Sequence, residues 1–230
     1  MAENFGNFLH GRRKIVFIGE SGSGKSEVAI NFAVGLKRET DREIHFFDMD
    51  QTKPLFRSRD IASHISREGV IFHSNITESI EDVAAIPSGV IEALTEADSH
   101  VILDIGGNVH GARMIGQFSQ YLNRENCVVF FLINPYRPWS RDLPNIEETI
   151  KIISSASRTV KIEIISNPNF GMATTSEDVI IGNQKLKGML NGLFPISFVC
   201  ALERLCPELE GRITESLIPM RIYILYPWLQ

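Results

Sequence analysis

One short stretch of the sequence, Gly19 to Ser26, combines glycines, serines and a lysine in the order GESGSGKS. A short apolar run precedes it and apolar residues at helical spacing follow it, so it connects an expected strand to an expected helix. Glycines allow backbone N–H groups to converge, and the N-terminus of a helix adds the positive end of its dipole. Such a turn is suited to binding phosphate groups.

The pattern G-x-x-x-x-G-K-S also assigns individual roles within this turn. Lys25 would reach the terminal phosphates of a nucleotide, and the Ser26 hydroxyl would ligate Mg²⁺. A flexible Gly/Ser turn is the ordinary alternative, but the bare pattern arises by chance in only roughly 1% of chains of this length. The residues expected to contact a nucleotide here are Gly19, Glu20, Ser21, Gly22, Ser23, Gly24, Lys25, Ser26 and Glu27.

Carboxylates follow two further apolar runs. Asp104 ends HVILD and is followed by Ile-Gly-Gly, the form in which an aspartate holds Mg²⁺ directly or through water, while Gly107 lets the backbone approach a γ-phosphate. Asp48 and Asp50 end the run IHFFDMD. If that strand lies beside the loop, Asp50 could orient an attacking water and Asp48 could support the metal. The ordinary alternatives are an aspartate that caps a turn and a solvated acidic loop.

These residues must be positioned by strands that alternate with helices. Short apolar strands are expected at 14–18, 44–48, 70–73, 100–104, 127–134, 161–166, 195–202 and 218–225. Nearly uniform apolar strands between helical segments indicate an α/β fold, with a mainly parallel sheet covered by helices on both faces. We expect one domain over residues 1–230, with 1–12 as a candidate flexible extension.

Composition excludes several classes of protein. Lys and Arg total 23 against 28 Asp and Glu, and this net charge of −5 argues against nucleic-acid binding as the main role. The 3 cysteines form no C-x-x-C pair, and the 6 histidines show no spacing typical of metal ligands. No signal-peptide core and no long apolar run is present, so we expect a cytoplasmic protein without a membrane span.

With these motifs in order, the sequence resembles the MinD/ParA group of P-loop ATPases, in the SIMIBI class that includes the nitrogenase iron protein and CobQ/CobB-type proteins. The resemblance rests on the loop, on Asp48 and Asp50 in FFDMDQTKP, on the D-x-x-G from Asp104 to Gly107, and on IISNPNFG, which contains Asn167. It implies a P-loop NTPase fold and an ATP-sandwiching homodimer with a responsive protein partner. It also implies that Asp50 positions the hydrolytic water and that Asn167 contacts the adenine.

One departure from this group concerns a second lysine, which the family carries at the position of Glu20 and which reaches across the dimer. A carboxylate pointing inward there would repel phosphates. Either Glu20 faces away, or another cation acts, or no such dimer forms. The candidate substitutes are Arg57, Arg59, Arg113 and Arg137.

The predicted activity is therefore slow, Mg²⁺-dependent ATP hydrolysis that switches a partner protein. A small-molecule or nucleotide kinase is the alternative, with residues 135–142 (PYRPWSRD) as a lid bearing two arginines and an exposed Trp139. The same segment could equally be a partner-binding loop, since Trp and Arg favour interface cores, or a plain surface loop with Trp139 packed inward. A regulatory module that binds nucleotide without turnover is the third hypothesis. A transport ATPase is excluded because no LSGGQ-like signature precedes the strand that ends at Asp104.

Overall fold

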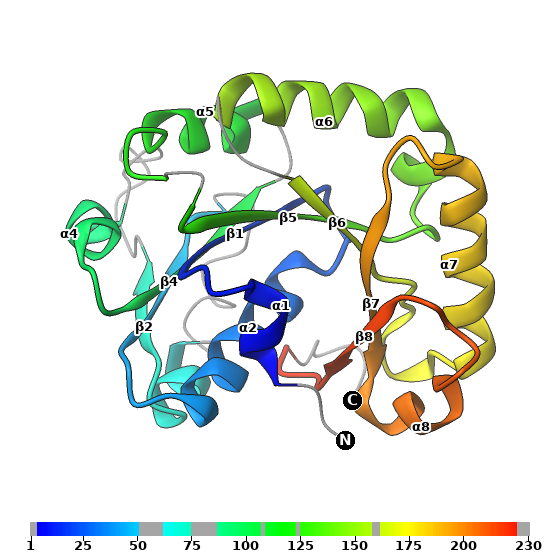
Figure 1. Cartoon of the computed structure of the whole chain (residues 1–230), viewed down its shortest axis with the longest axis horizontal. Helices are drawn as coiled ribbons and strands as arrows, with labels where there is room; N and C mark the ends of the chain where they lie inside the picture. Colours follow the sequence, from blue (N-terminus) through cyan, green and yellow to red (C-terminus); the bar gives the residue numbers. More distant parts are fainter. Residues whose placement is uncertain are drawn as a thin grey trace.

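The computed structural model describes residues 4–50, 62–74, 87–106, 109–122, 125–157 and 162–224, which form a parallel sheet with helices on both faces (Figure 1). The sheet has 8 strands in the order β3-β2-β4-β1-β5-β6-β7-β8. This architecture confirms the predicted α/β class. The strands are β1 (Lys14–Gly19), β2 (Ile44–Asp48), β3 (Ile71–Ser74), β4 (His100–Gly106), β5 (Cys127–Ile133), β6 (Ile162–Ser166), β7 (Ile196–Leu202) and β8 (Ser216–Met220).

Helices connect the strands and cover the two faces. Figure 1 shows α5 and α6 along one side of the sheet and α1 and α2 on the other. The α-helices are α1 (Phe5–Leu9), α2 (Lys25–Glu39), α4 (Val90–Thr95), α5 (Val109–Gln117), α6 (Leu143–Ser157), α7 (Ser176–Leu190) and α8 (Cys206–Leu209). Residues 62–67 are also helical, and the 3-10 turns are η1 (Pro138–Arg141), η2 (Gly171–Ala173) and η3 (Glu203–Leu205).

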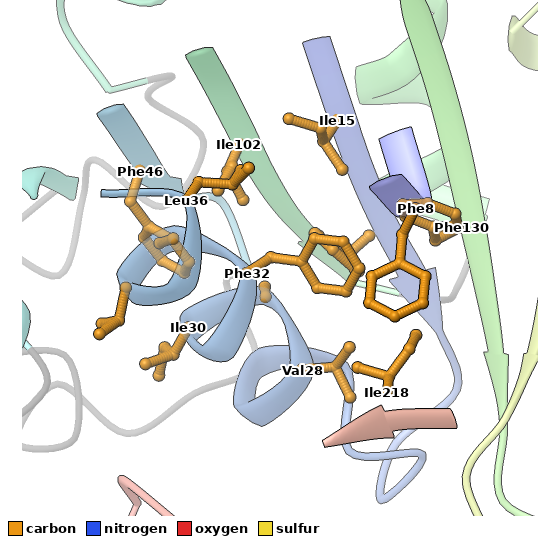
Figure 2. Packing of buried hydrophobic residues seen from close by; sticks show 14 of the residues in the cluster. Phe8, Ile15, Val28, Ile30, Phe32, Leu36, Phe46, Ile102, Phe130 and Ile218 are labelled. Atoms are coloured by element: carbon orange, nitrogen blue, oxygen red, sulfur yellow. The ribbon is translucent and has the colours of Figure 1, made fainter. Parts of the chain in front are cut away.

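Helix α2 packs its apolar side on the sheet. Figure 2 shows Val28, Phe32 and Leu36 of α2 on the side that faces the strand residues Ile102 and Phe130. All of these side chains are buried, and the rings of Phe32 and Phe130 lie 5.5 Å apart. Burying one such aromatic side chain stabilises the fold by about 2–3 kcal/mol. This packing fixes the start of α2, where the GESGSGKS turn ends.

Residues 4–12 were expected to form a flexible extension, but they are ordered and include helix α1. Helix α1 packs on α2, with Phe8 and Leu9 almost fully buried. The ring of Phe5 lies 5.1 Å from that of Phe32, and the Phe5 backbone N–H donates to the Glu39 carboxylate at 2.7 Å. The aromatic residues of this segment therefore extend the core over α2.

The last strand also differs from its predicted range. Strand β8 ends at Met220, whereas the apolar pattern predicted a strand over 218–225. The side chain of Asn31 on α2 explains the difference, because it accepts from the Arg221 N–H and donates to the Arg221 carbonyl, both at 2.8 Å. The chain beyond β8 is thus bonded to α2 instead of extending the sheet. Within the described ranges, no helix has both the length and the apolar character of a membrane span.

Candidate phosphate-binding site

The GESGSGKS turn connects β1 to α2 and takes a conformation that requires glycine. Gly22 and Gly24 have φ values of 79° and 88°, in the left-handed region. Gly24 also lies against Asn167, whose Nδ2 would be 2.3 Å from a Cβ at that position. Gly24 is the N-cap of α2 and supplies no side-chain hydrogen bond to the helix. The first-turn N–H groups of α2 are therefore suited to a ligand oxygen.

The predicted carboxylates lie together at the carboxyl edge of the sheet. Strands β2 and β4 pair with Asp48 directly opposite Asp104, a separation of about 4.8 Å between neighbouring parallel strands. The backbone N–H of Asp50 donates to Asp48 Oδ1 at 3.3 Å. Strand β4 also pairs with β1, which leads into the turn. The strand order thus places both acidic segments beside the predicted phosphate-binding loop.

Lys25 and Asp50 connect the loop to the acidic segment. Lys25 Nζ lies 2.6 Å from Asp50 Oδ2, and the two side chains are 9% and 2% exposed. Asp48 and Asp104 are also buried. Among the described residues this cluster therefore holds three buried carboxylates and one ammonium, an acidic environment suited to a hard divalent cation with oxygen ligands. The donor set thus fits Mg²⁺, with the Ser26 hydroxyl in the adjoining first turn of α2.

Asn167 lies directly beneath the loop. It follows β6, and its backbone N–H donates to the Ile133 carbonyl at 2.8 Å. Its side-chain Nδ2 donates to the Ser23 carbonyl at 2.7 Å, and the residue is 2% exposed. The structure therefore shows Asn167 fixing the loop, a contact that the sequence did not reveal.

Of the four candidate arginines, Arg137 contacts the loop. Its Nε donates to the Gly22 carbonyl at 3.1 Å, and its side chain is exposed. Arg113 is exposed on α5, and Arg57 and Arg59 lie outside the described residues. The sequence did not distinguish among the four arginines, because only the fold shows that the segment after β5 reaches the loop.

The segment 135–142 packs on the protein instead of presenting an exposed tryptophan. Trp139 is half-buried, and its ring meets that of Phe131 edge-on at 5.9 Å. Ser140 is fully buried and donates to the Asn134 carbonyl at 2.5 Å. The contact of Trp139 with Phe131 favours the alternative in which this tryptophan packs inward, and the segment brings Arg137 to the loop while anchored by its own buried residues.

Glu20 turns towards α6. Its carboxyl group has hydrogen bonds with the backbone of Ser21 and the side chain of Thr149, a residue of α6. Partial burial raises the pKa of this carboxyl group, although the Lys25 charge and these hydrogen bonds lower it. Glu20, the residue that departs from the family pattern, is thus held by contacts within its own chain.

Glu27 and Gly107 were also expected to lie at the bound nucleotide. Glu27 does not direct its carboxylate into the loop, because that group accepts hydrogen bonds from the backbone N–H groups of Tyr223 and Ile224. Burial raises the pKa of Glu27 to about 7. Its position in the first turn of α2 suggested a contact with the nucleotide, but its side chain points to the C-terminal segment. Gly107 lies outside the described residues.

The loop, the acidic strand ends and the parallel sheet together define the fold of P-loop nucleoside triphosphatases. No family model and no curated protein matches the sequence. Among solved structures, the chain is similar to the cell division protein FtsY from Thermotoga maritima, with 18% identity and a TM-score of 0.55 over 91% of this chain and 65% of that one. The chain therefore spans about two thirds of the length of that structure.

A second similar structure is a putative plasmid partition protein from Borrelia burgdorferi B31 bound to AMPPNP. The identity is 14% and the TM-score is 0.50, over 86% of this chain and 89% of that one. These similarities concern the fold alone, and they confirm the predicted α/β fold with a mainly parallel sheet between helices.

Proposed function

We propose that this chain binds ATP with Mg²⁺ and hydrolyses it slowly, acting as a nucleotide-dependent switch for a protein partner. The observation that carries this proposal is the buried pair of Lys25 and Asp50, 2.6 Å apart, beside Asp48 and Asp104, which lie opposite each other near the carboxyl ends of β2 and β4. An ammonium at a phosphate-binding turn, next to carboxylates that suit a divalent cation, is the combination that phosphoryl chemistry requires.

Each residue of the site would have a role that follows from its position. Lys25 and the backbone N–H groups of residues 20–26 would hold the phosphates, and Ser26, Asp104 and Asp48 would hold Mg²⁺. When bound, Mg²⁺ would neutralise charge on the phosphate oxygens. The phosphates would compete with Asp50 for the Lys25 ammonium, which would release the Asp50 carboxylate to accept a hydrogen bond from water. Nucleotide binding would in this way prepare the group that orients the attacking water.

The dimer and the base contact remain part of the proposal. The resemblance implies a homodimer around ATP. Glu20 interacts with its own α6, and of the two candidate arginines that the structure describes, Arg137 contacts the loop and is our candidate for the second cation. The resemblance also implies that Asn167 contacts adenine, in addition to its observed bond with Ser23. If Asn167 acts only through the loop, Asn167→Ala will weaken ATP and GTP binding equally. If it reads the base, the loss will be greater for ATP.

Two other activities would use the same loop. A kinase would transfer phosphate to an acceptor, and a regulatory module would bind nucleotide without turnover. The anchored segment 135–142 gives less support to a kinase lid, because Trp139 packs against Phe131. A phosphorylated acceptor would establish a kinase, and ATP binding by a wild-type protein whose turnover is no greater than that of Asp50→Asn would favour the module.

Calorimetry with ATP and Mg²⁺ tests the central assignment. We expect Lys25→Ala to abolish detectable ATP binding and Lys151→Ala, which alters an exposed lysine of α6, to bind as wild type does. Unchanged affinity in a folded Lys25→Ala variant would remove the phosphate-binding role. Asp50→Asn should retain binding but lose turnover, and a partner-free rate above about 1 s⁻¹, in the kinase range, would contradict the switch.

A further inference from the structure

A second group of chemically active side chains lies at the amino edge of the sheet, opposite the loop. His45 is the second residue of β2, and Glu43 precedes that strand. Glu96 is the C-cap of α4, a few residues before β4 begins. Glu43 and His45 thus lie at the start of β2, and Glu96 lies at the end of the helix that leads into the neighbouring strand β4, although it is distant from the others in sequence.

The ligand atoms of these residues are close enough to share one ion. His45 Nε2 lies 3.4 Å from Glu43 Oε2 and 3.8 Å from Glu96 Oε2. All three ligand atoms lie within 4.8 Å of one another. Tetrahedral coordination at the usual zinc distances places ligand atoms about 3.3–3.6 Å apart. Small rotations of the two glutamates would complete that geometry.

The ring of His45 is oriented by its neighbours. Its Nδ1 lies 3.0 Å from Nε2 of His73 on β3, so one of these nitrogens donates to the other. The His73 ring in turn stacks on Phe47 at 4.2 Å. A histidine ligand is commonly held in this way, by a hydrogen bond to the ring nitrogen that does not bind the metal.

The other ring nitrogen of His45 faces the carboxylates without a hydrogen bond. His45 Nε2 is buried and has no hydrogen-bond partner among the described residues. When Nδ1 donates to His73, Nε2 carries a lone pair directed at two negative groups, Glu43 and Glu96. This arrangement is unfavourable unless a cation lies between them. In the described ranges, no lysine or arginine forms an ion pair with either glutamate.

We propose that Glu43, His45 and Glu96 bind a divalent transition-metal ion, with Zn²⁺ as the best match. One imidazole with two carboxylates suits Zn²⁺, whereas Mg²⁺ prefers oxygen ligands alone. The glutamate side chains are 63% and 52% exposed, so water can supply the remaining ligand. The site shares no residue with the loop, and it stands independently of the proposed function.

Zinc titration of the nucleotide-free chain, in competition with a chromophoric chelator, tests this site. We expect one Zn²⁺ per chain, with affinity reduced at least tenfold in Glu43→Gln and in Glu96→Gln. Both variants retain side-chain shape at exposed positions, so folding should be preserved. His10→Asn is the matched control, because His10 is exposed and has a φ of 49°, which asparagine tolerates. This control should bind Zn²⁺ as wild type does.

A second measurement separates ligation from a merely structural effect. His73→Phe preserves an aromatic ring on Phe47 but removes the bond to His45, and it should weaken Zn²⁺ binding about tenfold. Co²⁺ should give the visible absorption of a tetrahedral site in wild type and lose it in Glu43→Gln/Glu96→Gln. Failure of wild type to bind Zn²⁺, or equal affinity in this double variant, would overturn the proposal.

Discussion

The two ends of β2 both present carboxylates, but under different physical conditions. At the carboxyl end, Asp48 and Asp50 are buried, and Asp50 pairs with Lys25 at 2.6 Å. At the amino end, Glu43 and Glu96 are more than half exposed around His45. A buried carboxylate needs a cation that the fold itself supplies, whereas an exposed one is stabilised by water.

This difference separates the energetic roles of the two ends. Removing one partner of a buried ion pair costs about 3–5 kcal/mol, because the other charge is left in a poor solvent. An exposed pair contributes about 0–1 kcal/mol. Substitutions at the carboxyl end of β2 should therefore change both the free energy of unfolding and the function. Substitutions at the amino end should change the free energy of unfolding appreciably only when a ligand is bound.

The largest expected effect is that of Lys25→Ala on the free energy of unfolding. The substitution leaves the buried Asp50 carboxylate without its ammonium, and should destabilise the protein by about 3–5 kcal/mol in urea denaturation. Lys25→Ala/Asp50→Asn should recover most of that loss without recovering ATP binding. Equal stability of Lys25→Ala and wild type would show that the pair does not stabilise the fold.

Glu27 supplies an intermediate case, since it is half-buried and its carboxylate accepts hydrogen bonds from backbone N–H groups. Its pKa of about 7 in the fold exceeds the ordinary value of 4.5, so the folded state binds the proton more tightly. Stability from this group is present below pH 4.5 and is lost as pH rises through 7. Glu27→Gln should remove this loss, which is at most about 3 kcal/mol.

Unfolding free energies of wild type and Glu27→Gln at pH 5 and pH 8 provide the measurement for Glu27. The advantage of the glutamine variant should be greater at pH 8, because Glu27 is ionised there. A difference that is the same at both pH values would mean that Glu27 does not titrate in this range. Glu39→Gln is a suitable control, since that carboxylate is bonded to the Phe5 and Gly6 N–H groups near the surface.

Much of the carboxyl-edge site follows from sequence, because parallel strands gather their ends at one edge. The positions of Asp48 and Asp104 could therefore be predicted from two apolar runs that each lead into an aspartate, although β4 continues two residues further, to Gly106. The pairing of Lys25 with Asp50 could not, since it depends on which strands become neighbours. The same holds for Asn167 and Arg137, which reach the loop from the segments after β6 and β5.

The group formed by Glu43, His45 and Glu96 at the amino edge of the sheet could not be recognised from the sequence. Metal sites are recognised in sequence by ligands at short, regular spacing, and Glu43 and Glu96 belong to separate segments. The histidines were therefore interpreted as having no metal spacing. The direction of the Glu27 side chain could not be predicted for a related reason, because helical periodicity alone did not show that it would meet Tyr223.

Arg137→Ala should have a smaller effect than the changes at Lys25 and Glu27. The substitution removes one exposed hydrogen bond to the Gly22 carbonyl, and a loss of about 1 kcal/mol corresponds to roughly fivefold weaker ATP binding. Arg141→Ala, on the same segment, is the control and should bind as wild type does. Equal affinities for Arg137→Ala and Arg141→Ala would show that the loop does not depend on this contact.

The smallest effect is expected for Glu96→Gln in the absence of metal. Its side chain is 52% exposed, so the unfolding free energy should change by no more than about 0.5 kcal/mol. At a free Zn²⁺ concentration of 100 times Kd, wild type should gain about 2.7 kcal/mol, because the ion binds only the folded site. Glu96→Gln should gain at least about 1 kcal/mol less, owing to its tenfold weaker affinity. Equal gains in thermal or urea denaturation would mean that Zn²⁺ binds elsewhere, and the contrast between the two ends of β2 would then rest on exposure alone.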